Sequence, residues 1–331
     1  MISFDRPPVA HAARTEAIRK FGPRVTPRRF WLLVACGLLA FSATGVIAAE
    51  TPYELINRLA ATSPITVHEL RGGIYMLEGS GGNIGVLSGP DGKLMVDCGI
   101  AVSKVKIEEA LARLGTAPLR YAINTHWHWD HSDGNAWVRL TGAKLIADAH
   151  TVRRLGESIR IEEWGHTFEP VPKSALPNAP ISREKVIRLN GEIVRIRQYR
   201  PGHTDGDLSV MFERADVLQT GDTYWNGMYP FIDYVTGGDI DGTIAAANVN
   251  IALSSPRTLV IPGHGQIGDQ KSLIAFRDML VAIRARVSAL KADGKSLEAV
   301  QAAQPTAEYD AVWGGSIISG SLFTALVYRG V

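Results

Sequence analysis

One short string constrains this chain more than any other feature: residues 126–131 read H-W-H-W-D-H, directly after a strand-like apolar run. Side chains two residues apart in an extended segment point the same way, so His126 and His128 can bind one cation together. A turn into a helix then carries Asp130 and His131 to a different side. The string therefore predicts two sets of metal ligands close together, as a binuclear site requires.

Three further strings each place a histidine or an aspartate beside glycine, after a strand-like run. They are Pro201-Gly202-His203, Thr220-Gly221-Asp222 and Pro262-Gly263-His264. Glycine lets the backbone approach closely. Taken alone, each string is more typical of a turn or a helix cap, but their recurrence at equivalent strand exits favours a ligand role. Imidazole and carboxylate without thiolate suit Zn²⁺ best, with iron and manganese as alternatives.

From residue 51 onward the chain shows no internal repeat and no long linker, which favours one domain of the α/β class. Two sets of strands are expected, each followed by helices. The predicted strands are 65–71, 74–78, 84–88, 93–98, 119–124, 143–147, 185–189, 193–199, 208–213, 217–220 and 258–261; the predicted helices are 102–114, 133–140, 148–155, 240–253 and 272–291. Residues 156–180 are expected to form a long loop, and a loop of that length is usually a functional lid or flexible.

The N-terminal segment differs in composition from the rest of the chain. Residues 1–49 hold seven basic side chains against two acidic ones, and an uncharged apolar run from Phe30 to Ala49 follows Arg28 and Arg29. A basic region, an apolar run and a small-residue exit are typical of a secretory signal, and the paired arginines resemble a twin-arginine signal.

Two alternatives for this segment stay open. The apolar run is long enough to span a bilayer, so residues 30–49 would be the one membrane contact if they are not cleaved. The other alternative is a lipoprotein signal around Cys36. Each reading places the domain 50–331 in the periplasm, secreted, or anchored to the membrane facing the periplasm.

The seven histidine and aspartate residues, in this order and spacing, resemble the metal-binding motifs of the metallo-β-lactamase fold superfamily. Residues 81–87 and 94–99 also resemble that family's early hairpin and its aspartate-bearing strand. The resemblance covers essentially the whole chain after the N-terminal segment. It implies a four-layer αββα sandwich with two metal ions at one edge, between the two sheets.

The resemblance also implies a role for each residue. One metal would be held by His126, His128 and His203, the other by Asp130, His131 and His264, and Asp222 would bridge the two. Asp97 would orient the ligand loop.

Together with the export predicted from residues 1–49, the resemblance leads us to expect an exported binuclear hydrolase. A hydroxide that bridges the metals would attack a cyclic amide or ester carbonyl, in a β-lactam or a lactone, with Asp130 positioning the nucleophile or moving its proton. Relatives with a bridging aspartate include glyoxalase II-like thioesterases and other ester hydrolases, so these remain alternatives. Aromatic residues beside the motifs, Trp129, Tyr224 and Trp225, are the predicted substrate contacts, with core packing as the competing interpretation.

A binding protein for a metal or solute on the same scaffold is the non-enzyme alternative. The complete ligand set argues against it. A nucleic-acid partner is not expected, because 35 basic residues against 33 acidic ones leave no marked basic excess. The expected partner is a small-molecule substrate.

Overall fold

The structure is a computed structural model, and it describes residues 49–331. Residues 1–48 lie outside the described part of the chain, and with them nearly all of the predicted signal or anchor. That prediction and the boundary at residue 49 therefore stay predictions. Within residues 49–331, none of the helices combines the length and the apolar character that crossing a bilayer requires.

The first sheet has seven strands in the order β1-β2-β3-β4-β5-β6-β9. Neighbours pair antiparallel from β1 to β4 and parallel from β4 to β9. Its strands are β1 (Thr66–Glu69), β2 (Ile74–Glu78), β3 (Ile84–Gly89), β4 (Gly92–Val96), β5 (Leu119–Ile123), β6 (Lys144–Asp148) and β9 (Ala179–Ile181).

The second sheet has five strands in the order β10-β11-β12-β13-β14. They are β10 (Glu184–Leu189), β11 (Glu192–Gln198), β12 (Leu208–Phe212), β13 (Val217–Gln219) and β14 (Leu259–Ile261). The last pair, β13 and β14, is parallel. Both strands of that pair therefore end at the same edge of the sheet, which is where the strings around Asp222 and His264 follow.

The two sheets pack face to face through apolar side chains that alternate along the strands. Met76 and Val96 of the first sheet share a buried cluster with Ile196 and Val210 of the second. Their neighbours in the chain face the other way, as with Met95, which belongs to a separate cluster beneath the helices. This alternation is the period of two that a sheet covered on both faces imposes.

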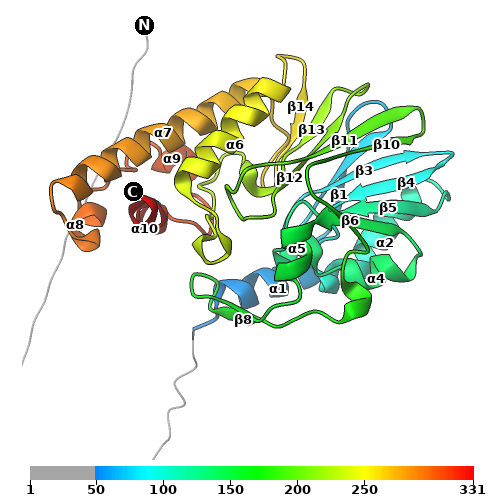
Figure 1. Ribbon diagram of the computed structural model, residues 1–331, viewed down its shortest axis with the longest axis horizontal. Helices are drawn as coiled ribbons and strands as arrows, with labels where there is room; N and C mark the ends of the chain where they lie inside the picture. The colour runs from blue at the N-terminus through cyan, green and yellow to red at the C-terminus, as the bar shows by residue number, and fades with distance from the viewer. Residues whose placement is uncertain (1–48) are drawn as a thin grey trace, which may run out of the picture. The chain divides into compact units, whose positions relative to one another are not determined.

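Helices cover the outer face of each sheet, as Figure 1 shows. On the first sheet lie α2 (Lys104–Arg113) and α4 (Asn135–Leu140); on the other side lie α6 (Ile240–Leu253), α7 (Gln270–Ala292) and α10 (Gly320–Gly330). The short helices α3 (Trp129–Ser132), α5 (Ala149–Arg154), α8 (Leu297–Ala302) and α9 (Asp310–Trp313) join these elements. The predicted αββα sandwich is confirmed.

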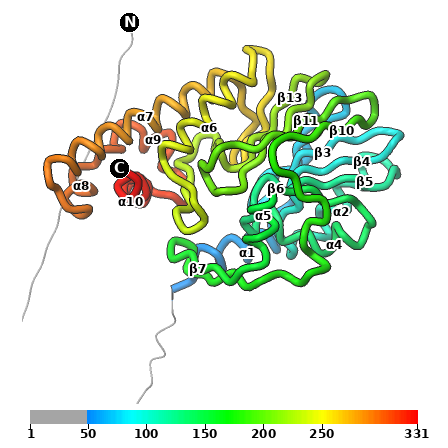
Figure 2. Tube along the Cα trace, viewed as in Figure 1, coloured from blue at the N-terminus to red at the C-terminus, as the bar shows by residue number. Residues whose placement is uncertain are grey.

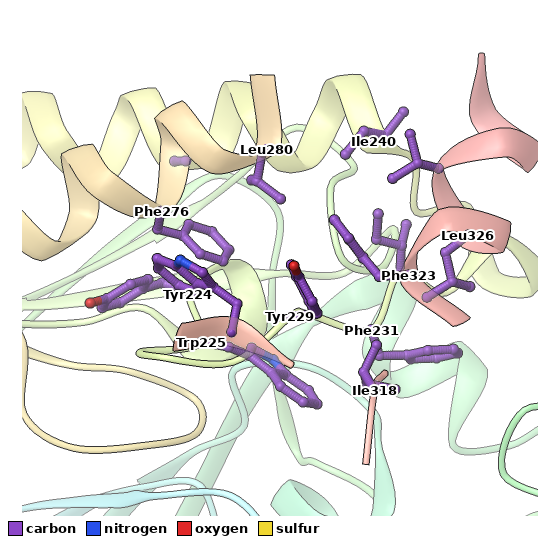
Figure 3. Close-up of a cluster of buried hydrophobic side chains, with 14 of the residues drawn as sticks. Tyr224, Trp225, Tyr229, Phe231, Ile240, Phe276, Leu280, Ile318, Phe323 and Leu326 are labelled. Atoms are coloured by element: carbon purple, nitrogen blue, oxygen red, sulfur yellow. The ribbon is translucent and has the colours of Figure 1, made fainter. Parts of the chain in front are cut away.

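A third buried cluster joins the α7 side of the molecule to the loop after β13. Figure 3 shows Phe276 and Leu280 of α7 and Phe323 of α10 gathered around Tyr229 and Phe231. The rings of Tyr229 and Phe323 stack at 4.8 Å between centroids. The C-terminal helices are therefore part of the same core as the loop that follows Asp222.

The prediction of one long loop over residues 156–180 is wrong in part. It contains a hairpin of β7 (Ile159–Ile161) and β8 (His166–Phe168), and it ends in β9 at the edge of the first sheet. Strands of three residues carry too little alternation to be recognised from the sequence.

The sequence reading also missed the helix that opens the domain, α1 (Pro52–Thr62). Thr51 caps it, accepting a hydrogen bond from the backbone of Glu54, whose side chain in turn accepts from the backbone of Thr51. This reciprocal pair, with proline at the first helical position, is a local start signal that could have been recognised. Figure 2 shows α1 beside β7.

Candidate metal centre

The motif at 126–131 enters a helix as predicted, but a bent loop, and not an extended segment, precedes that helix. After β5 ends at Ile123, the chain carries His126 and His128 through a buried loop and then enters α3, which carries Asp130 and His131. All four residues are buried, with at most 5% of their surface exposed. The switch from this loop to a helix separates the two pairs, which belong to different groups of donors.

The second sheet supplies the other three side chains. His203 lies in the turn between β11 and β12, Asp222 in a single helical turn after β13, and His264 in the loop after β14. Because β13 and β14 are parallel neighbours, Asp222 and His264 arrive together at one edge of the sheet.

One group of donors gathers around His128. Its Nδ1 lies 3.1 Å from Nε2 of His126 and 2.8 Å from Nε2 of His203. With Asp222, these three histidines form a buried set whose donor atoms all lie within 4.8 Å of one another. Three imidazole nitrogens converging on one point is the arrangement of a zinc site.

The second group gathers around His264. Its Nε2 lies 3.3 Å from Oδ2 of Asp130 and 3.5 Å from Nε2 of His131. These three residues also bring their donor atoms within 4.8 Å of one another. The two groups have the membership predicted for the two metal sites.

Asp222 lies between the groups and contacts both. Its Oδ2 is 3.5 Å from Nε2 of His203 and 3.3 Å from Nε2 of His264, and its Oδ1 is 3.0 Å from Nε2 of His131. A carboxylate in this place can give one oxygen to each of two cations. The bridging role of Asp222 and the ligand roles of the other six residues stay predictions. The observed geometry is the one that these roles require.

Asp97 lies behind the centre, in the place predicted for it. Its carboxylate accepts hydrogen bonds from the backbone and the hydroxyl of Thr125 at 2.7 and 2.9 Å, and it lies 2.8 Å from Nδ1 of His131. The backbone of Asp97 adopts a left-handed conformation (φ 66°), which is uncommon for a residue with a side chain. These hydrogen bonds hold the strained residue in place and fix the orientation of the His131 ring.

Asp233 lies behind His128 as Asp97 lies behind His131, and this residue was not predicted from the sequence. Its buried Oδ2 lies 3.0 Å from Nε2 of His128 and accepts a hydrogen bond from the hydroxyl of Thr236. The backbone carbonyl of Phe231 completes the set by accepting from Nδ1 of His203 at 2.8 Å. Nothing near Asp233 in the sequence marks it, because its partner lies 105 positions away.

The electrostatics of the metal-free centre differ between its histidines. Burial lowers the pKa of His203 to about 4 and holds that of His126 well below its usual value. Burial also acts to lower the pKa of His131, but the carboxylates of Asp222, Asp130 and Asp97 outweigh it and raise this pKa well above the ordinary value. His126 and His203 therefore stand ready as neutral ligands, while His131 carries a proton that a cation must displace.

The centre fits a bound cation on two observations besides its donor set. Oδ1 of Asp222 is buried and has no hydrogen-bond partner of acceptable geometry among the described residues, although His131 is near. Glycines also make room: a Cβ at Gly263 would lie 2.0 Å from Oδ1 of Asp222, and one at Gly82 would lie 2.2 Å from the ring of His131. A cation between the groups would satisfy the unpartnered oxygen.

An apolar cavity of about 360 Å³ opens onto the centre. Asp130, Asp222, His128, His203 and His264 form its polar end. The rest of the wall is almost entirely apolar: Leu55, Ile56, Leu59, Trp129, Trp164, Trp225, Met228, Phe231 and Ile317, with Gly81, Gly315 and Ser316. A concave apolar pocket with polar groups gathered at one end is the usual form of a small-molecule site.

Two of the three aromatic residues predicted to contact substrate line this cavity. Trp129 packs against Trp164 at 5.4 Å between ring centroids, and Trp225 lies against His264 at 4.2 Å. Tyr224 is different: it is fully buried, packs edge-on to Phe276 of α7 and is not part of the cavity wall. Its prediction as a substrate contact is wrong, because consecutive residues in an extended segment point to opposite sides.

Comparison with known families matches residues 77–264 to the family described as the metallo-beta-lactamase superfamily. In sequence, the chain is 29% identical over 184 residues to a probable metallo-hydrolase of Methanocaldococcus jannaschii, covering 54% of this chain and 84% of that protein. It is also 29% identical over 160 residues to a hydroxyacylglutathione hydrolase of a Polaromonas species, covering 48% of this chain and 53% of the relative.

Solved structures resemble the fold at lower identity. A metallo-beta-lactamase from Pontibacter korlensis superposes with a TM-score of 0.53 at 17% identity, over 66% of this chain and 99% of the other. A stereoselective inverting sec-alkylsulfatase from a Pseudomonas species gives a TM-score of 0.60 at 16% identity, over 84% of this chain and 51% of the other. The chain thus spans about half the length of the alkylsulfatase and of the Polaromonas relative.

Proposed function

This chain belongs to the metallo-beta-lactamase superfamily and is a metal-dependent hydrolase, and from that premise we propose that it is an exported binuclear enzyme that opens a β-lactam or a lactone. In the reaction, water adds to the carbonyl carbon and the ring C–N or C–O bond breaks. The products are a carboxylate and an amine or an alcohol on the same opened chain.

The observation that carries this proposal is the meeting of two groups of donors at the polar end of an apolar cavity. The donor chemistry favours zinc in both positions, with iron and manganese as alternatives. Bound there, two cations would supply a water of lowered pKa and polarise the scissile carbonyl.

The chain's own side chains have distinct tasks in this proposal. Asp130 lines the cavity, with Oδ2 3.3 Å from Nε2 of His264, so it can orient the attacking water and accept its proton. Asp97 and Asp233 fix the rings of His131 and His128 from behind. Trp129 and Trp225 contact the apolar part of the substrate and limit the access of water.

A thioesterase of the glyoxalase II kind is the second candidate. It is supported by the similarity to the Polaromonas hydroxyacylglutathione hydrolase and by Asp222 in the bridging place. Residues 1–49 support export in either case, through their basic start and apolar run.

The test is turnover by the purified protein, supplied with zinc, of a panel of a chromogenic cephalosporin, aliphatic lactones, thioesters and simple esters. We expect ring opening that a chelator abolishes and that added zinc restores. Turnover of thioesters alone would favour the glyoxalase II-like thioesterase over the lactam or lactone hydrolase. Metal binding without turnover of any member would favour a metal- or solute-binding protein instead.

A further inference from the structure

The apolar cavity is built from two kinds of segment. Its polar end lies within residues 77–264, the stretch that matches the family. Much of the rest of the wall comes from outside that stretch, from α1 at the start of the domain and from residues 315–317 near its end. The chemistry and the shape of the site are therefore encoded in different parts of the chain.

Helix α1 presents a row of apolar side chains to the cavity. Leu55, Ile56 and Leu59 all line it, and Leu55 and Leu59 are one helical turn apart. Leu59 keeps 41% of its surface exposed, although it is a large apolar residue. An apolar side chain left exposed at a cavity gains from the arrival of an apolar ligand.

Several contacts fix α1 in this position. The backbone N–H of Tyr53 donates to the carbonyl of Trp164 at 3.3 Å, which ties α1 to the β7–β8 hairpin. The ammonium group of Lys106 donates to the carbonyls of Ala60 and Ser63 at the other end of the helix, at 2.5 and 2.6 Å. The wall formed by α1 is therefore held at both ends.

Residues 315–317 are held from the opposite side. The backbone N–H of Tyr229 donates to the carbonyl of Trp313 at 2.9 Å, and its hydroxyl donates to Oδ1 of Asp310 at 2.8 Å. Ile318, directly after the segment, is buried in the cluster shown in Figure 3. Ile317 is thus positioned at the cavity by a core that includes the loop after Asp222.

The charged side chains of the cavity are confined to one end of it. Within residues 49–331, neither lysine nor arginine lines it, and its ionisable side chains all belong to the candidate metal centre. An anionic group lying against the apolar wall would lose its water without gaining a cation as partner. A neutral hydrocarbon group meets no such cost.

We propose that this cavity selects an uncharged ester or lactone with an apolar tail, and that α1 and residues 315–317 determine that preference. The inference rests on the proposed hydrolase function, and it chooses lactones over β-lactam antibiotics. Cephalosporins carry a carboxylate and no long apolar chain to lie against this wall, so we expect them to be the poorer substrates.

The test begins with binding to the metal-free protein, which separates the cavity from the chemistry. Decanamide is neutral and is not expected to be hydrolysed without metal. Its binding can be followed by the fluorescence of the cavity tryptophans Trp129, Trp164 and Trp225. Each buried methylene strengthens binding about fourfold, so burial of only two of the six additional methylenes would make decanamide bind more than about tenfold tighter than butanamide.

A second pair of probes tests charge. The monoamide of decanedioic acid has the same chain length as decanamide but ends in a carboxylate. We expect it to bind at least about tenfold more weakly than decanamide. Equal affinity of the two long amides, or equal affinity of the long and short amides, would overturn the proposal.

Matched variants locate the preference. Leu59→Gln and Ile317→Gln place a neutral polar group on the wall and should each weaken decanamide binding. Val312→Gln, at a position 63% exposed on α9 and away from the cavity, is the control and should leave it unchanged. The chain-length comparison on the unaltered protein decides the question even where a variant fails to fold.

Turnover then distinguishes the two proposals. Chain-length-dependent binding without hydrolysis of any lactone or β-lactam by the zinc-loaded protein would refute the proposed function and leave the apolar selectivity standing. Hydrolysis of lactones with binding independent of chain length would refute the selectivity and leave the function standing.

Discussion

The metal centre and the wall of the cavity beside it differ in polarity and in the elements that supply their residues. The centre is polar, and its donors follow strands of the two sheets, where backbone hydrogen bonds and the side chains of Asp97 and Asp233 fix them. The wall is apolar and comes partly from helices and loops at the two ends of the domain. Groups that do the chemistry can thus follow the strands of the sheets, while the residues that contact the substrate come from segments at the two ends of the domain.

The largest effect is expected from removal of the carboxylate between the two groups of donors, because it tests whether the metal centre carries the chemistry. For Asp222→Ala we expect turnover to fall by more than about 10³-fold, which corresponds to about 4 kcal/mol of lost transition-state stabilisation. Metal content per chain should fall as well, because Asp222 contacts both groups. Steady-state kinetics and elemental analysis measure the two effects.

Asp278→Asn, at an exposed position on α7, is the control and should match the unaltered protein. Unchanged metal content in Asp222→Ala would show that this carboxylate is not a ligand.

A subtler change tests whether the residues behind the centre belong to its function. Asp233→Asn keeps the size of the side chain but removes the charge that faces Nε2 of His128. We expect metal affinity to fall by about 10- to 100-fold, the usual effect of losing such a partner. Competition with a chromogenic chelator measures it, and an affinity equal to that of the unaltered protein would contradict the assignment.

The pH dependence of metal binding tests whether His131 is a metal ligand. The pKa of His131 is raised well above its usual value in the metal-free protein, so the ring is protonated at neutral pH. Metal binding must release that proton, and affinity should rise about tenfold per pH unit until the pH reaches this pKa.

Calorimetric titrations in buffers of different ionisation enthalpy count the protons released. An affinity that is constant between pH 6 and 8, with no proton released, would show that His131 does not become a ligand.

The smallest expected effect lies on the wall. Leu59→Ala removes part of a side chain that is already 41% exposed, so we expect kcat/KM for a long-chain lactone to fall only about threefold. Short-chain lactones and metal affinity should be unaffected. A fall of equal size for both chain lengths would place Leu59 in the support of the centre and weaken the division between the two regions.

The sequence predicts the centre better than the wall, for a physical reason. His126, His128, Asp130 and His131 lie within six consecutive positions, so local geometry alone suggests their use. His203, Asp222 and His264 each stand beside glycine at the end of a strand, which is again a local signal.

The wall carries no comparable signal. Leu59 and Ile317 are ordinary apolar residues, and only the packing of α1 and the C-terminal segment brings them to one cavity. Asp233 is similar, because its role depends on a partner 105 positions away. The prediction for Tyr224 failed through the orientation of one side chain, which the composition of its segment does not determine.

The contact between His131 and His264 joins positions 133 residues apart, one beside each sheet. Such a contact requires closure of the long intervening loop, which costs conformational entropy. The centre is therefore complete only when both sheets are in place, and an ion held there stabilises the finished fold over its earlier forms. The lifetime of the folded state, and with it resistance to proteolysis, should lengthen with the supply of metal.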